Sequence, residues 1–302
     1  MNTARIRTAT ESDLPAINEL AQRCFVWDTF SSDLLAEKLF KHVRLSEFAW
    51  ETRVAEQGGT LIGLLQSVVR PTAAKAWVGL FAVAPEVRRR GLASALLDHA
   101  RAAWPDGIRE VEALAIPGNY FAPGLDPRYT AALCFLERRG FERFKDCVNL
   151  VGDLAQPFET ASEEARLAGE RIEIRRAREG DNTLLDAFFD ANFGADWRFE
   201  VSLAMDNDPP ALHLALRDGA IIAFSAHSTQ NREWGFFGPM GTTPDARGHG
   251  LGRVLLWHCL NDMRAAGHKA CVIPWVGPIA FYHQWAGCRV ERVFWRFRLM
   301  LA

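Results

Sequence analysis

A short run of glycines after an apolar stretch is the feature that most constrains this chain of 302 residues. Gly248, Gly250 and Gly252 separate the aromatic segment 233–237, which we expect to form a buried strand, from residues 254–263, whose apolar spacing is helical. Without a Cβ, glycine lets the backbone approach a ligand closely. The unpaired amides of such a loop and of the first helical turn favour an anion, as does the helix dipole. The run therefore predicts a strand, a phosphate-binding loop and a helix.

Three kinds of phosphate loop share this outline. A P-loop carries Lys and then Ser or Thr after its last glycine, whereas this chain has Arg253 and Val254. A dinucleotide-binding fingerprint would place glycine at position 253, where arginine stands. The third form is Arg or Gln, two residues, Gly, one residue, then Gly or Ala. It fits at Arg247, Gly250 and Gly252.

The same pattern occurs a second time, upstream. Arg88, Gly91 and Ala93 follow the apolar segment 76–83, and in both copies a proline precedes the motif arginine by three residues. Two independent matches in one chain argue against coincidence. Both motifs resemble the pyrophosphate loop of the GNAT acetyltransferases, which bind acyl-coenzyme A.

The resemblance implies an α/β fold of the α+β type with mixed sheets. We expect two GNAT-fold domains in tandem, each with a mixed, splayed central sheet flanked by helices. A hydrophobic content of 49% suits two ordinary domains that each bury a core. We place a degenerate, structural N-terminal domain at residues 1–153, a linker helix at 154–170 and a catalytic C-terminal domain at 171–302. Residues 172–181 restate the pattern of residues 6–13.

Periodicity and turn signals predict the elements of each half. Helices are expected at residues 13–24, 33–44, 94–103, 130–139 and 183–192, with one more ending near Gly287. Strands are expected at residues 6–9, 52–55, 60–65, 76–83, 111–116, 141–150, 172–176, 212–216, 220–224, 270–275 and 290–301. Residues 117–128 form an insertion rich in turn residues. A functional loop over a binding face and a packed interdomain connection both remain open for it.

The composition excludes several classes of protein. A formal net charge of -2 argues against a general nucleic-acid binder. No run approaches the roughly 18 apolar residues of a membrane helix, and no signal peptide core is present at the N-terminus. The six cysteines form no Cys-x-x-Cys pair, so reduced thiols are expected. We therefore expect a cytoplasmic monomer or homodimer without nucleic-acid, membrane or metal partners.

The resemblance also implies acetyl-CoA (coenzyme A) as the cofactor, held by the strand before each loop and by the loop itself. In the C-terminal repeat the implied contacts are Met240, Gly241, Thr242, Arg247, Gly248, His249, Gly250, Leu251, Gly252 and Arg253. In the N-terminal repeat they are Phe81, Ala82, Val83, Arg88, Arg89, Arg90, Gly91, Leu92 and Ala93. Pro239 lacks an amide, so its strand offers one donor fewer than usual.

In GNAT enzymes an amine attacks the thioester directly, without a metal or a covalent enzyme intermediate. The protein supplies proximity, oxyanion donors, a base and an acid. The acid is often Tyr in a Phe-Tyr-x-x-x-Gly-Phe pattern, a position that Leu136 occupies in the first repeat. The second repeat has one extra residue before Gly287. Alignment on Phe-Tyr makes Tyr282 the acid, and counting back from glycine gives His283; Tyr282 is favoured.

The general base has no candidate, because the positions at which many relatives carry Glu hold Trp77 and Phe236. His213 and His227 could act through water, although a hydrogen-bonded core position is the commoner fate of a strand histidine. The leading interpretation is an N-acetyltransferase that moves an acetyl group from acetyl-CoA to a primary amine of a small molecule or peptide in a ternary complex. Its layout is similar to that of mycothiol synthase. The alternative is a non-enzymatic acyl-CoA-binding module, and a dinucleotide-binding oxidoreductase is a distant third.

Overall fold

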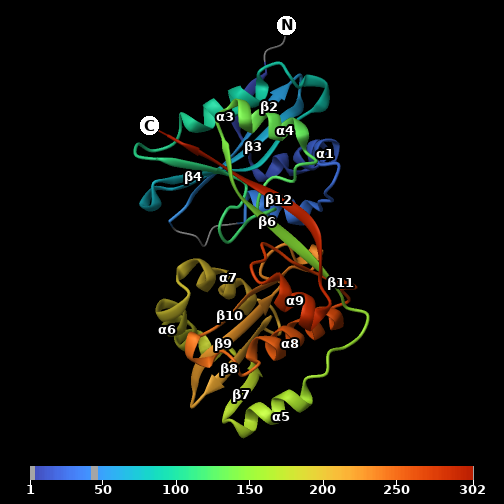
Figure 1. The fold of residues 1–302 in the computed structure, drawn as a ribbon. Helices are drawn as coiled ribbons and strands as arrows, with labels where there is room; N and C mark the ends of the chain where they lie inside the picture. The colour runs from blue at the N-terminus through green and yellow to red at the C-terminus, as the bar shows by residue number, and fades with distance from the viewer. Residues whose placement is uncertain (1–3, 42–46, 302) are drawn as a thin grey trace. The chain divides into compact units, whose positions relative to one another are not determined.

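The computed structural model describes residues 4–41 and 47–301 (Figure 1). The chain divides into two compact units. Unit 1 comprises Met1–Cys147 together with Val293–Ala302, and unit 2 comprises Val148–Arg292. The units are therefore not the two contiguous halves that we expected from the sequence, since the last ten residues of the chain group with its beginning.

Unit 1 contains one sheet with helices on both of its faces. Its elements are β1 (Arg5–Thr8), α1 (Leu14–Cys24), α2 (Ser32–Leu39), β2 (Ala49–Gln57), β3 (Thr60–Arg70), β4 (Lys75–Val83), α3 (Leu92–Arg101), β5 (Glu110–Ala113) and α4 (Thr130–Arg138). Neighbouring strands are antiparallel from β1 to β4, and β4 and β5 are parallel. Residues 61–69 of β3 are all buried, as expected for a strand on which both α1 and α3 pack. The end of the helix predicted at 33–44 lies outside the described residues.

Unit 2 repeats this plan with further helices. Its elements are α5 (Ala161–Gly169), β7 (Ile172–Arg176), α6 (Asn182–Asn192), α7 (Ala195–Met205), β8 (Leu212–Arg217), β9 (Ala220–His227), β10 (Phe237–Thr242), α8 (Leu251–Ala265), β11 (Ala270–Ile273) and α9 (Ile279–Ala286). The strands β10, β9, β8 and β7 form an antiparallel sheet in that order. Helix α7 was missed by sequence reasoning because its apolar residues do not gather on one face.

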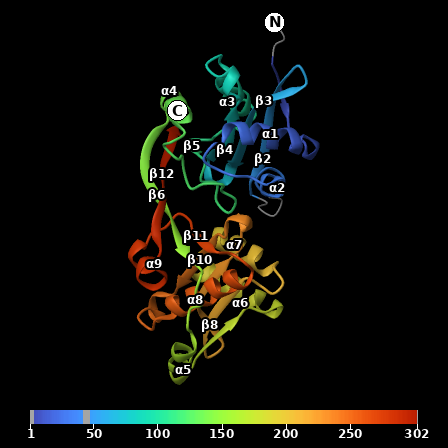
Figure 2. The same ribbon diagram turned by 90° about the vertical axis from the view of Figure 1, so that its right-hand side faces the viewer.

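The two faces of the unit 2 sheet follow the alternation of side chains along its strands. Leu212 and Leu214 of β8 lie in one apolar cluster with Phe189 of α6. Ala215 points to the opposite face and packs with Leu255 of α8. Helices α6 and α7 thus cover one face and α8 the other, as can be followed in Figure 1 and Figure 2.

The strand predicted at 233–237 is displaced along the sequence from the observed one. Arg232–Trp234 form a 3₁₀ turn, and β10 begins only at Phe237. Asn231 and Gly235 flank the turn with φ values of 46° and 63°. These left-handed conformations interrupt extended backbone, which moves the start of the strand toward the glycine loop.

Two strands each belong to both units, as Figure 2 shows for β6 (Glu142–Asp153) and β12 (Arg289–Met300). β6 starts in unit 1, and its last four residues pair with β11 in unit 2. β12 starts in unit 2, and its residues 297–300 pair with β5 in unit 1. β12, β6 and β11 thus belong to one eight-stranded sheet with β1 to β5, whereas β10, β9, β8 and β7 form a separate sheet.

The insertion at residues 117–128 packs within unit 1. Leu125 and Trp295 exchange two backbone hydrogen bonds, each of 2.8 Å. A Cβ on Gly124 would lie 2.8 Å from the carbonyl oxygen of Trp295, so only glycine fits there. Asn119 and Asp126 are buried. Of the two interpretations of this segment, the packed connection agrees with its burial.

The helix of the expected linker is an integral part of unit 2. Leu167 of α5 is fully buried, in a cluster with Leu251, Val254 and Leu255 of α8 and Ile172 of β7. Burying a leucine side chain contributes about 1.5–3 kcal/mol, enough to hold a short helix in place. In the part of the chain that the structure describes, no helix is long and apolar enough to cross a membrane.

Candidate functional site

The glycine loop of unit 2 adopts the conformation that its sequence predicts. A 3₁₀ turn at Pro244–Ala246 leads from β10 into the loop, and Gly250 caps the N-terminus of α8. Gly248 and Gly250 have φ values of 91° and 78°, a left-handed region that glycine enters without steric cost. The Arg253 amide donates to the Gly250 carbonyl at 3.1 Å, so the amides available to a ligand in the first turn of α8 are those of Leu251 and Gly252, which have no carbonyl four residues earlier within the helix.

Unit 1 repeats this geometry with a different residue. Gly91 caps α3 with φ 85°, the counterpart of Gly250. Arg89 stands where unit 2 has Gly248 and has φ 64°. A left-handed conformation costs a residue with a Cβ about 1–2 kcal/mol. The first loop therefore has the same backbone course but carries strain that the second avoids.

A pocket of about 530 Å³ lies at the loop of unit 2. Eight of the ten residues predicted to contact the cofactor in this repeat line it: Thr242, Arg247, Gly248, His249, Gly250, Leu251, Gly252 and Arg253. Met240 and Gly241 are not among the lining residues. Met240 lies behind the loop, where its Cε would be 3.4 Å from a Cβ on Gly252. Gly241 faces the rings of Phe193 and Phe224.

Five further lining residues were not predicted as contacts: Glu163 and Arg166 of α5, Ala246 just before the loop, and Phe281 and Trp285 of α9. Trp285 is one of the aromatic residues among them. Its ring lies 4.4 Å from the guanidinium carbon of Arg253. No local signal pointed to the residues of α5, because they reach the loop from about 80 positions away in the sequence.

Next to this pocket the central strands separate. β10 and β11 share one parallel bridge, between Phe236 and Val272, where the Val272 amide donates to the Gly235 carbonyl at 2.8 Å. β10 then bulges between Phe237 and Met240. In unit 1 the parallel pairing of β4 and β5 likewise ends, at the Val78 pair. In both units the parallel neighbours thus pair over only part of their length, as the expected splay requires.

The same backbone donor is unavailable in both repeats. In unit 2 the position holds Pro239, which has no amide. In unit 1 it holds Leu80, whose amide donates to the side-chain oxygen of Gln66 at 3.1 Å. Neither strand therefore has a free backbone donor at this position.

The other predicted contacts in unit 1 lie along β4 and its exposed loop. Ala82 and Val83 are buried, and the Phe81 ring packs 5.1 Å from that of Phe135. Arg88 donates from Nε to the Val83 carbonyl at 2.9 Å, so its side chain is tied to the strand end. Arg89, Arg90 and Gly91 are exposed, and Leu92 and Ala93 are half-buried in the first turn of α3.

Tyr282 lies in the core behind the pocket. Its side chain is 7% exposed, and its ring contacts those of Phe237 at 6.0 Å and Phe281 at 5.1 Å. Burial raises the pKa of the Tyr282 phenol, and the neighbouring Cys288 adds to this effect. A phenol carries its proton at neutral pH in any case, and the raised pKa means that Tyr282 holds this proton more tightly. Phe281, one residue earlier, is the residue that lines the pocket.

His283 points elsewhere. It is exposed at the C-terminal end of α9, and its Nδ1 is 3.0 Å from the Cys288 carbonyl oxygen, to which it donates. It is not among the lining residues of the pocket. In unit 1 the corresponding position holds Leu136, which is buried and has no polar group. The positions at which a base was sought, Phe236 and Trp77, are buried aromatic side chains.

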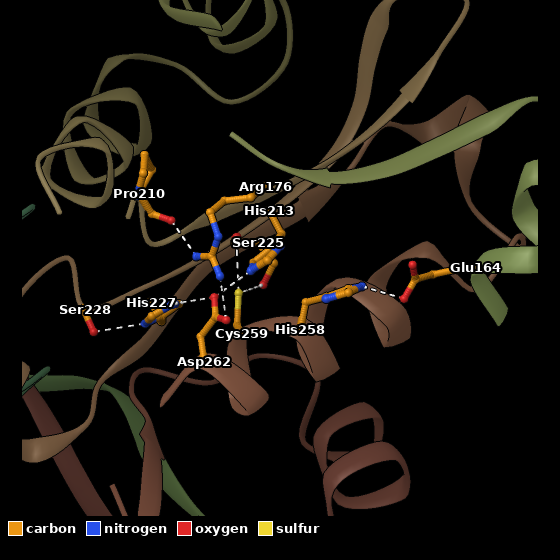
Figure 3. A network of polar contacts seen from close by, with 10 residues as sticks. All are labelled: Glu164, Arg176, Pro210, His213, Ser225, His227, Ser228, His258, Cys259 and Asp262. Atoms are coloured by element: carbon orange, nitrogen blue, oxygen red, sulfur yellow. Dashed lines mark hydrogen bonds and ion pairs between the residues drawn. The ribbon is translucent and has the colours of Figure 1, made fainter. Parts of the chain in front are cut away.

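The two strand histidines lie in a buried network at the far end of α8 (Figure 3). His213 and His227 point to the α8 face, where Asp262 receives contacts from His213 at 2.7 Å and His227 at 3.4 Å. Arg176 of β7 donates to the other oxygen of Asp262 at 2.7 Å. Twelve residues of α8 separate Asp262 from Gly250, about 18 Å along the helix. These histidines therefore have structural partners away from the loop.

The charges in this network are set by burial and by pairing. Burial by itself would raise the pKa of Asp262, but the hydrogen bonds from His213, His227 and Arg176 outweigh it and hold the pKa well below its usual range. Burial lowers the pKa of His213, partly offset by Asp262. Among the described residues, no group of three or more His, Cys, Asp or Glu side chains is arranged to hold a metal ion.

Comparison with solved structures supports the fold. A GCN5-related glucosamine N-acetyltransferase region of a fungal multi-domain GH3 β-N-acetylglucosaminidase matches 99% of this chain at 18% identity with a TM-score of 0.82; this chain spans 38% of that longer one. A GCN5-related N-acetyltransferase from Sphaerobacter thermophilus matches at 19% identity and TM-score 0.72, over 98% of this chain and 95% of its own. A tandem GNAT protein from the clavulanic acid biosynthesis pathway matches at 16% identity and TM-score 0.71, over 99% and 98%. At such identities the likeness concerns the fold alone.

Family assignment rests on two matches within the chain. The family model of the acetyltransferase (GNAT) domain matches residues 48–143, and that of the acetyltransferase (GNAT) family matches residues 176–287. No curated protein matches the chain. The two matched segments together cover more than half of its length and contain both glycine loops. The chain therefore belongs to the GNAT acetyltransferases, carries two of their domains in tandem and is an acyltransferase.

Proposed function

We propose that this protein transfers an acetyl group from acetyl-CoA to a primary amine of a small molecule or peptide, at the C-terminal repeat. The observation that carries the proposal is the pocket at the unit 2 loop, beside the separation of β10 from β11. The pocket would suit the anionic end of acetyl-CoA, and the gap between the strands would suit its narrow extended arm.

The residues at this pocket fit the phosphates of coenzyme A. A Cβ on Gly248 would meet no atom within 4 Å, so the loop is open on that side. Arg247 and Arg253 line the pocket around the glycines and supply positive charge, and His249 adds an imidazole. Guanidinium groups and first-turn amides are the donors that phosphate groups favour. When bound, acetyl-CoA would supply the activated acyl group as a thioester.

The chain's own residues would then position the acetyl-CoA arm and the amine, and would protonate the departing sulfur. The separated strands would hold the arm by backbone amides beyond Pro239 and would keep the amine in line with the acyl carbon. Tyr282, whose phenol carries a proton at neutral pH, would donate that proton to the departing sulfur. The aromatic side chains Phe237 and Phe281 beside it would exclude water from the reacting atoms.

The test combines binding with turnover. Calorimetric titration with coenzyme A is expected to show binding that Gly250→Glu abolishes, because the new carboxylate both repels phosphate and strains a left-handed position. Thiol release from acetyl-CoA is then measured over a panel of amines, with Gly91→Glu as the matched variant in unit 1. Absence of coenzyme A binding by the unaltered protein would refute the proposal.

The rival function is a non-enzymatic acyl-CoA-binding module. Two observations favour it: the buried Leu136 where an acid would stand, and Phe236 where a base would stand. Coenzyme A binding without acetyl transfer to any amine of the panel would support this rival.

We also infer a cytoplasmic location, which the six free cysteines support, because free thiols persist in reducing compartments.

A further inference from the structure

Helix α5 places an arginine directly on the glycine loop of unit 2. The Nη2 atom of Arg166 donates to the His249 carbonyl at 2.6 Å. The same atom would lie 3.4 Å from a Cβ on Gly250, and Arg166 lines the pocket. A guanidinium at this point faces the ligand space that the loop amides also face.

Carboxylates of the same helix neutralise the positive charges around the loop. Glu163 accepts from Arg166 at 3.1 Å and is paired with Arg253 at 2.6 Å. Glu170 accepts from both Arg166 and His249. Because Glu163 itself lines the pocket, its negative charge occupies the surroundings in which a phosphate group would lie.

The position of α5 is set by packing, so Arg166 is held at the loop rather than on a loose linker. Leu167, the next residue, is fully buried against α8. Glu164 is paired with His258 of α8 at 3.0 Å, a contact drawn in Figure 3. The helix therefore contacts α8 through an apolar side chain and through ion pairs on two successive turns.

The guanidinium of Arg253 lies against two tryptophan rings. It lies over the rings of Trp257 and Trp285, at 5.2 Å and 4.4 Å from their centres. Its Nε is buried and has no hydrogen-bond partner among residues 4–41 and 47–301. A buried donor without a partner is costly, whereas the Nη2 atom of Arg253 is paired with Glu163, which lines the pocket.

We propose that α5 is part of the cofactor site: Arg166 binds a phosphate group of coenzyme A together with the loop, and that phosphate replaces Glu163 as the counter-ion of Arg166 and Arg253. This inference rests on the proposed function, because it assumes that coenzyme A is the ligand. The exchange conserves the number of ion pairs of the two arginines. It substitutes a dianionic group with several acceptor oxygens for one carboxylate.

The test is calorimetric titration of the full chain with coenzyme A. Arg166→Ala is expected to weaken binding about tenfold to a hundredfold, the usual effect of one charge-assisted hydrogen-bonding group. Glu163→Gln is expected to strengthen binding roughly threefold or more, because it removes a like charge from the phosphate surroundings. Arg171→Ala is the matched control. Its side chain is 80% exposed and pairs with Asp218 outside the pocket, so its affinity should be unchanged.

A second arm identifies the phosphate. If Arg166→Ala also binds 3′-dephospho-coenzyme A more weakly than the unaltered protein does, Arg166 binds the diphosphate. If the two proteins bind this analogue equally well, Arg166 binds the 3′-phosphate. Both results support the proposal. Arg166→Lys, which keeps the charge but not the planar fork, should bind with intermediate affinity. Thermal unfolding of each variant shows whether it is folded.

Two results separate the inference from the function on which it rests. Equal affinity of folded Arg166→Ala and the unaltered protein would overturn the role of α5 and leave the proposed function intact. Weaker binding by Glu163→Gln would overturn the counter-ion exchange. No coenzyme A binding by the unaltered protein would instead refute the proposed function.

Discussion

Tyr282 and His283 are neighbours in sequence with opposite surroundings. Tyr282 is buried beside β10, whereas His283 is exposed and donates to the Cys288 carbonyl at the end of α9. Helical geometry turns adjacent side chains by about 100°, so one extra residue before Gly287 decides which of the two faces the separated strands. The two alignments that the sequence left open therefore correspond to two distinct environments.

Replacing Tyr282 by Phe should lower kcat by at least about tenfold and leave coenzyme A affinity nearly unchanged, because only the proton-donating hydroxyl is lost. Steady-state kinetics and calorimetry check the two quantities separately. His283→Ala tests the other alignment and should keep most of kcat. Full activity of Tyr282→Phe together with an inactive Gly91→Glu would transfer the active centre to the N-terminal repeat.

Helix α8 has different surroundings at its two ends. Its N-terminus carries the glycine loop, while its C-terminal half meets buried polar groups of β7, β8 and β9. His213 is 4% exposed, and its Nδ1 has no hydrogen-bond partner within the described part of the chain. Because burial lowers its pKa, the folded protein holds His213 neutral at pH values at which the unfolded chain binds a proton.

The free energy of unfolding should therefore fall as the pH drops below about 6.5, the ordinary pKa of histidine, by up to about 1.4 kcal/mol per pH unit for this group. The loss continues until the pH reaches the lowered pKa of the folded state. Asp262, which contacts His213 at 2.7 Å, adds a second dependence at lower pH: its lowered pKa contributes stability that is present above about pH 3.9 and is lost in stronger acid.

Urea denaturation at a series of pH values measures this dependence. His213→Gln should flatten the slope between pH 7 and the lowered pKa, whereas His99→Gln, at an exposed position of α3, should leave it unaltered. An unaltered slope in the His213 variant would show that other groups carry the pH dependence.

Across the whole molecule, β6 and β12 link the folding of the two units. Residues 297–300 complete the sheet of unit 1 although they are separated by some 180 positions from β5, their partner. Loop closure over such a distance costs conformational entropy, which the buried side chains of β12 offset. Phe297 is one of these, with an exposed fraction of 2%.

Phe297→Ala should lower the free energy of unfolding of unit 1 by about 3–5 kcal/mol, as expected for an emptied core position. Hydrogen exchange should speed up in Glu110–Ala113, the partner strand. Val290→Ala lies in the same strand but in unit 2, is 47% exposed, and should have little effect. Exchange in β5 that stays as slow as in the unaltered protein would contradict the role of β12 in unit 1.

Local signals accounted for much that the sequence alone determined. The left-handed glycines at the two loops, the helices that follow them and the hairpins all depend on contacts within about 15 residues, and such contacts leave turn residues and periodicity in the sequence. Both GNAT units and most lining residues of the pocket follow from these signals. The limits of local reading show in α7, whose apolar residues lack one face, and in β10, which a left-handed turn displaces.

Tertiary structure alone decided the features that join distant parts of the chain. β6 and β12 pair with β11 and β5, which lie far away in the sequence. The apolar pattern of a strand does not indicate which other strand it pairs with. Likewise, the placement of Arg166 on the loop depends on burial of Leu167 against α8, a packing choice with no local signature. The sequence determined the backbone of the glycine loop, because backbone conformation is local. Packing determined which charges surround that loop.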